Sequence, residues 1–177
     1  MRKLHITLIA VAALTLSSCW HQDPIQVIRD KYSMMIPGDM SIETSPVDRN
    51  EDASLQYQNF WLEKYILVID EPTQDLRDLG GFYGYKPEID QFRDLILRDM
   101  EISFRCTATD YENLLIDGLL ARSAELHGTF EGVDIAVKMF FIQGKTDLYQ
   151  IMAWTTQEKE YTVMPILEKA ALSFDEY

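Results

Sequence analysis

Few side chains of this 177-residue sequence could carry catalysis or hold a metal ion. His127 and Glu125 lie two residues apart on the same face of an expected strand and could be drawn as a metal pair. Zinc needs three or four ligands, and the expected folded domain offers no second histidine, so we interpret His127 as a surface residue. The acidic stretch from Asp70 to Asp78 does not match the alternating aspartates and glycine bend of a calcium loop, so we expect a solvated loop there.

A thiol nucleophile would need a nearby base. Cys106 lies in Ser103-Phe104-Arg105-Cys106-Thr107, and the histidines that follow Ser18 are His21 and His127. We interpret Cys106 as a buried, inert thiol. The sequence also lacks the Gly-x-Ser-x-Gly elbow of many serine hydrolases. A hydrolase that brings His127 beside Cys106 or a serine is the least favoured alternative, and we expect a protein that is not an enzyme.

Cys19 is the residue with the most specific chemical signal. Met1-Arg2-Lys3 is a basic start, Leu4 to Leu16 is largely apolar, and Leu16-Ser17-Ser18-Cys19 follows. This order is typical of an export signal, and the apolar run is shorter than the ~20 residues that span a bilayer. The four residues around Cys19 resemble the bacterial lipoprotein signal, in which the thiol is acylated before cleavage. An ordinary signal peptide cut near Ser18, or a short membrane anchor, is the alternative.

Lipidation at Cys19 would set the domain organisation. We expect 1–18 as a signal peptide, 19–30 as the lipidated cysteine and its tether, and 31–177 as one domain. Cleavage before Cys19 removes Arg2 and Lys3 but no acidic residue, so the processed chain is more acidic than the full sequence. Trp20 rather than aspartate follows the cysteine. The resemblance to bacterial lipoproteins, in which aspartate at this position signals retention in the inner membrane, then implies the outer membrane facing the periplasm if the cell has two membranes. Cys106 would then be the remaining thiol, so no internal disulfide can form.

The overall composition is that of a globular protein with its own core. Apolar residues make up 47% of the chain and charged residues 25%, with 29 acidic against 16 basic residues and a net charge of −13. So acidic a chain argues against nucleic acid as a partner, because phosphate binding needs clustered lysine and arginine. Nothing in the sequence predicts a cofactor.

Hydrophobic periodicity predicts strands, a helix, three more strands and a final helix. The expected strands cover 32–36, 53–59, 65–70, 121–130, 133–143 and 147–156, and the expected helices begin at Pro87 and near Gln157. The helix after Pro87 has an apolar stripe through Ile89, Phe92, Leu95, Ile96 and Met100. The last helix carries Tyr161, Met164, Leu167, Ala171 and Phe174, with a capping box at Thr155 and Glu158. Pro165 predicts a kink or a helix that begins late.

The segment Gly80 to Pro87 is the best candidate for a binding loop. It brings Phe82, Tyr83 and Tyr85 together among three glycines, and so many aromatic side chains in a turn can serve recognition. The alternative, which we favour, is that these rings cover the edge of the core where the next helix begins. The glycine spacing is not that of a phosphate loop.

The order of elements resembles the PsbP-like superfamily, which includes DcrB-type and related bacterial lipoproteins. The resemblance covers about residues 31–174 and depends on the strand that ends at Ile36-Pro37, the three-strand meander that ends at Trp154-Thr155-Thr156, and the final Leu172-Ser173-Phe174. It implies an α+β fold in which an antiparallel β-sheet is flanked by helices. The resemblance also implies an accessory or binding protein. With the lipid anchor, the small single fold and the lack of a catalytic set, we therefore expect a non-enzymatic accessory protein that binds another envelope protein. A carrier of a small apolar ligand under residues 80–87 is the alternative.

Overall fold

Two antiparallel sheets form the frame of the protein. The computed structural model describes residues 22–83 and 88–177, with the side chains of residues 79–83 left out. The larger sheet contains β3 (Ser41–Ile42), β4 (Ala53–Asn59), β5 (Lys64–Pro72), β6 (Thr107–Ile116), β7 (Leu119–Phe130), β8 (Val133–Gln143) and β9 (Asp147–Thr156). Its strand order is β3-β4-β5-β9-β8-β7-β6. The smaller sheet places β2 (Tyr32–Ile36) between β1 (Ile25–Ile28) and β10 (Asp175–Glu176).

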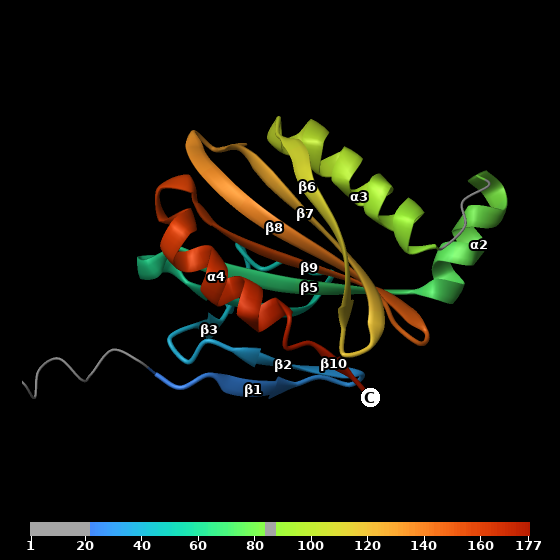
Figure 1. Ribbon diagram of the computed structural model, residues 1–177, viewed down its shortest axis with the longest axis horizontal. Helices are drawn as coiled ribbons and strands as arrows, with labels where there is room; N and C mark the ends of the chain where they lie inside the picture. The colour runs from blue at the N-terminus through green and yellow to red at the C-terminus, as the bar shows by residue number, and fades with distance from the viewer. Residues whose placement is uncertain (1–21, 84–87) are drawn as a thin grey trace, which may run out of the picture.

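Three helices cover this frame in the described part of the chain, α2 (Thr73–Tyr83), α3 (Ile89–Phe104) and α4 (Glu160–Ala171). Two 3-10 turns, η1 (Phe60–Leu62) and η2 (Gln157–Lys159), precede β5 and α4. Figure 1 shows α3 along the β6–β8 half of the larger sheet and α4 between that sheet and the smaller one. Across the described residues, no helix combines the length and the apolar character needed to cross a bilayer.

The larger sheet has a hydrophobic cluster on each face. The face toward α4 buries Phe140, Ile142 and Ile151 against α4 and the smaller sheet. The face toward α3 buries Val137, Met139 and Phe141 against α3. Because side chains alternate along a strand, a strand covered on both faces must be apolar at successive positions. The continuous apolar run of β8 is therefore explained by helices on both sides of the sheet.

The predicted α+β fold class is confirmed, and several strands have the predicted bounds. The strands at 32–36, 53–59, 133–143 and 147–156 agree with the sequence periodicity. Glu131 and Gly132 join β7 and β8 with positive φ angles of 50° and 85°. Such angles give the backbone twist that a two-residue hairpin needs.

Three differences concern where elements begin and end. Ile25–Ile28, inside the stretch expected as a tether, form β1 because Val27 is buried while the strand pairs with β2. The acidic stretch expected as a loop instead ends β5 and begins α2 at Thr73. The Gly80–Tyr83 part of the expected aromatic loop is the last turn of α2.

Details of the two predicted helices also differ. Leu95 of α3 is exposed and Leu97 takes its place in the core, while Tyr161 at the start of α4 is almost fully exposed. The predicted capping box is wrong, because no side chain caps η2, and α4 begins later, at Glu160. α4 begins at Glu160, later than the expected start near Gln157, but Pro165 still lies inside the helix rather than in its first turn.

Candidate binding site

The residues that the sequence singles out do not form one described site. Cys19 and Tyr85 lie outside the described residues. Phe82 and Tyr83 are the last two residues of α2, and their side chains are not described. A binding role for the 80–87 segment therefore stays a prediction.

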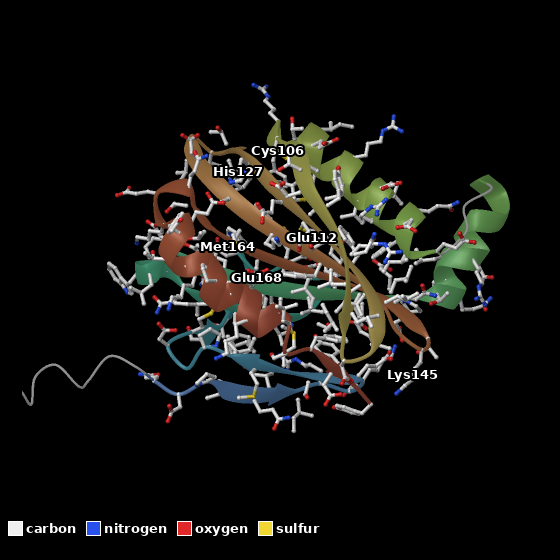
Figure 2. The ribbon with its side chains drawn as sticks, viewed as in Figure 1. Cys106, Glu112, His127, Lys145, Met164 and Glu168 are labelled. Atoms are coloured by element: carbon white, nitrogen blue, oxygen red, sulfur yellow. The ribbon has the colours of Figure 1, made fainter. Side chains whose placement is uncertain are left out.

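The pair that a hydrolase would need is separated by the sheet. The His127 Nε2 atom lies 2.7 Å from the Glu160 Oε1 atom, on the face toward α4. Cys106 instead packs with the cluster under α3, where its thiol lies 3.5 Å from the carbonyl oxygen of Met100. Figure 2 labels both residues. Burial raises the pKa of the Cys106 thiol, helped by the Glu101 charge, so the thiol is less reactive than a free cysteine.

A buried lysine, Lys138, lies in β8 on the face of the larger sheet that is covered by α4. The Lys138 Nζ atom is 2.6 Å from the Glu125 Oε1 atom and 4.0 Å from the Glu168 Oε1 atom, with 7% of the side chain exposed. Burial acts to lower the pKa of Lys138, but the hydrogen bond and charge of Glu125 and the charges of Glu168 and Glu112 outweigh it, so the pKa is raised. These partners keep the lysine protonated, which makes it a structural cation rather than a base. In the described ranges, no three His, Cys, Asp or Glu side chains are grouped to hold a metal ion.

A groove of about 470 Å³ lies between α4 and the turn that follows β2. Its walls are largely apolar and hold three prolines, whose fixed φ angles keep the backbone rigid. The lining residues come from the start of the described chain, from β2 and its turn, from β5 and from α4. They are Gln22, Pro24, Met35, Pro37, Asp39, Lys64, Pro165, Ile166, Lys169, Ala170 and Ser173.

Charged groups lie at one side of this groove. The Lys64 Nζ atom is 2.6 Å from the Asp39 Oδ2 atom, and 8% of the lysine side chain is exposed. The other carboxylate oxygen, Asp39 Oδ1, is buried and has no hydrogen-bond partner among the described residues. A buried acceptor without a donor is costly.

Two contacts fix the shape of the groove. A Cβ atom built on Gly38 would clash with the Asp23 carbonyl oxygen, so only glycine lets the start of the chain lie this close to the turn. On the α4 side, the Ser173 hydroxyl accepts a hydrogen bond of 2.8 Å from the Met35 amide and donates one of 2.6 Å to the Ala170 carbonyl. Contacts within the chain therefore hold the walls of the groove in place.

Sequence reasoning missed this groove because its residues come from opposite ends of the chain. Pro165 reads in the sequence only as a break in a helix, yet it lines the wall of the groove. The three prolines Pro24, Pro37 and Pro165 are a weak sequence signal for a groove, because nothing in the sequence shows that they lie close together in the fold.

Comparison with known proteins finds no matching family model and no curated protein of similar sequence. Solved structures do match. Cyanobacterial PsbP (CyanoP) from Synechocystis sp. PCC 6803 has a TM-score of 0.62 at 12% identity, over 91% of this chain and 96% of that chain. LpqN of Mycobacterium tuberculosis, described as involved in cell envelope biogenesis, has a TM-score of 0.51 at 11% identity, over 86% of this chain and 88% of that chain.

A Bacteroides thetaiotaomicron protein matches with a TM-score of 0.55 at 9% identity, over 89% of this chain and 49% of that chain. Identities this low establish a shared fold and nothing about function. The chain therefore has the PsbP-like fold that its order of elements implied.

Proposed function

We propose that this chain is a lipid-anchored accessory protein of the bacterial cell envelope, and that it binds a segment of another envelope protein in the groove beside α4. The lipid attachment point is Cys19, and Trp20 after it favours the outer membrane. The role does not involve catalysis. The shared fold with LpqN, described as a protein of cell envelope biogenesis, supports the envelope location.

The groove is the observation that carries the binding role. It is preformed and open, its walls are apolar at Met35 and Ile166, and its charged wall contains Lys64 and Asp39. Apolar walls with few polar groups are typical of a binding site. An extended segment with apolar side chains would bury these apolar walls.

Site-specific photocrosslinking in the native envelope tests this role. A photoreactive residue at Ile166, which is partly exposed in the groove, should yield an adduct with one protein. The same residue at Leu115, exposed on the distant strand β6, is the matched control and should yield none. A second substitution, Lys169→Glu at the groove, should weaken the Ile166 adduct. Equal adducts at the two positions, or none at Ile166, would contradict the proposal.

A further inference from the structure

An exposed aromatic turn projects from the connection between β4 and β5. Phe60 is 68% exposed, Trp61 86% and Leu62 37%, and the two aromatic rings meet edge to face with centroids 5.9 Å apart. We call these three residues the tip. Single exposed apolar residues are ordinary on protein surfaces, but three adjacent ones that include a tryptophan form a contact surface.

The tip is held in a fixed shape by the residues on each side. The Asn59 side chain accepts a hydrogen bond from the Leu62 amide at 3.1 Å and donates one to the Asp39 carbonyl at 2.6 Å. Glu63 follows in the left-handed region, with φ at 55°. Its carboxylate accepts a hydrogen bond from the Thr156 hydroxyl and lies 3.3 Å from Lys159 Nζ. The rings are thus presented to solvent by an ordered turn.

The tip lies at the end of the molecule where the described chain begins. The start of β1 and the start of β5 are both at the left of Figure 1. They are linked through the turn after β2, where Gly38 lies against Gln22 and Asp23. The next residue, Asp39, accepts hydrogen bonds from Asn59 and Lys64. Cys19 precedes Gln22 by three positions, which span at most about 11 Å when extended.

The charges that border the tip are neutralised within the chain. Glu63 pairs with Lys159, and Lys64 pairs with Asp39. The hydrogen bond from Thr156 and the pairing with Lys159 outweigh burial and lower the pKa of Glu63. Tyr161, in the first turn of α4 and two residues beyond Lys159, adds a ring that is 95% exposed. Tryptophan and tyrosine prefer the water–lipid boundary, where a ring can be half buried and its polar atom stays wet.

We propose that the tip enters the lipid headgroup region of the bilayer to which Cys19 is attached, and so fixes the orientation of the domain on that membrane. The proposal rests on the lipid anchor of the proposed function. An anchor alone leaves the domain free to rotate, whereas a second contact at the same end holds the groove beside the membrane surface. The lipid surface that fits is neutral, because the chain is acidic and anionic headgroups attract basic rather than acidic segments.

Tryptophan quenching by lipid tests the position of the tip. The lipidated full chain carrying Trp20→Phe and Trp154→Phe keeps only Trp61, and is reconstituted in phosphatidylcholine vesicles with or without brominated acyl chains. Brominated lipid should quench Trp61 strongly and shift its emission to shorter wavelength. The matched chain with Trp20→Phe and Trp61→Phe keeps only Trp154, which stacks on Tyr65 in the sheet with centroids 5.2 Å apart. It should be quenched severalfold less.

The possible outcomes distinguish a failure of membrane insertion by the tip from a failure of lipid attachment at Cys19. Mass spectrometry of the purified protein is done first. An unmodified Cys19 would overturn both the proposed lipid anchor and the proposed insertion of the tip into the membrane. A lipidated chain in which Trp61 is quenched no more than Trp154 overturns the docking and leaves the anchor standing. A photoreactive residue at position 61 that forms an adduct with a protein rather than lipid in cells also overturns it, because the tip would then be a protein contact.

Discussion

The two ends of the larger sheet differ in how their carboxylates and aromatic side chains are placed. At the β8–β9 turn, the Glu176 carboxylate accepts hydrogen bonds from the Lys145 amide at 3.0 Å and the Tyr149 hydroxyl at 3.0 Å. Asp147, whose side chain is buried, is paired with Lys31 at 2.6 Å. Figure 2 shows Lys145 at this end, which we call the closed end.

The opposite end, which carries the groove and the tip, is the open end. Phe60 and Trp61 are exposed there. A buried atom without a partner among the described residues does not distinguish the two ends, because Asp39 Oδ1 lies at the open end and Arg29 Nε lies in the β1–β2 turn. Protein folding normally buries apolar rings and pairs buried polar atoms. The difference indicates that the paired carboxylates of the closed end contribute to stability, whereas the open end exposes two adjacent aromatic rings that an external surface can cover. Substitutions should therefore cost much more stability at the core and the closed end than at the tip.

Phe174→Ala should give the largest loss of stability. Phe174 is buried and packs against Tyr32 and Tyr149, with ring centroids 5.1 Å and 4.8 Å away. Removal of a buried ring leaves a cavity and costs about 3–5 kcal/mol, which urea unfolding measures. Phe130→Ala, at a half-exposed position, is the control and should cost much less. Equal losses would show that the aromatic cluster does not hold the two sheets together.

Lys64→Met should destabilise the protein less, by about 1–3 kcal/mol, because it leaves the Asp39 carboxylate beside the groove without its cation. Chemical denaturation measures the loss. Lys169→Met, at an exposed position of the same groove, should leave the free energy of unfolding nearly unchanged, as surface substitutions usually do. A neutral Lys64→Met variant would mean that the ion pair adds nothing to the frame of the groove.

Alkaline pH should weaken the closed end through Tyr149. Burial and the Glu176 carboxylate raise the pKa of the Tyr149 hydroxyl. The folded state therefore keeps its proton while the unfolded state loses it. The stabilising contribution is complete below about pH 10 and is lost above that pH, by at most ~1.4 kcal/mol per pH unit. Tyr149→Phe should make this fall in unfolding free energy shallower without abolishing it, because burial also raises the pKa of Tyr32. Tyr161→Phe should leave the fall unchanged.

Phe60→Ser combined with Trp61→Ser should have the smallest effect on stability, because both rings are exposed. Substitutions at such surface positions usually change the free energy of unfolding very little. Thermal unfolding in detergent measures this, with Trp61→Phe as the conservative control. A loss comparable to that of Phe174→Ala would show that the tip is part of the core, and the division into two ends would fail.

Much of the fold follows from periodicity in the sequence. The apolar alternation of β8 predicts one shared face for Ile135, Val137, Met139 and Phe141, and all four do contact the α3 side. One hairpin was missed although its signal is present. Asp117 and Gly118 have φ angles of 49° and 78° between β6 and β7, and an aspartate–glycine pair between apolar runs is a strong hairpin signal.

The short elements could not be predicted in the same way. β1 and β10 are strands because each pairs with β2, and Asp175 pairs with Ser33 from the other end of the chain. The groove depends on that pairing, since it places Pro24 and Met35 beside α4. The run Phe60-Trp61-Leu62 is readable in the sequence, but its exposure follows from the turn that Asn59 and Glu63 impose. Such tertiary effects override local patterns.

The central claim is that the open end faces the membrane and the closed end faces away from it. Labelling of single cysteines with a membrane-impermeant maleimide on lipidated chains in sealed vesicles tests this most directly, in a Cys106→Ala background. Phe60→Cys, which keeps Trp61, should be protected until detergent is added, whereas Lys145→Cys at the closed end should react at once. Equal reaction of the two cysteines before detergent would contradict the account.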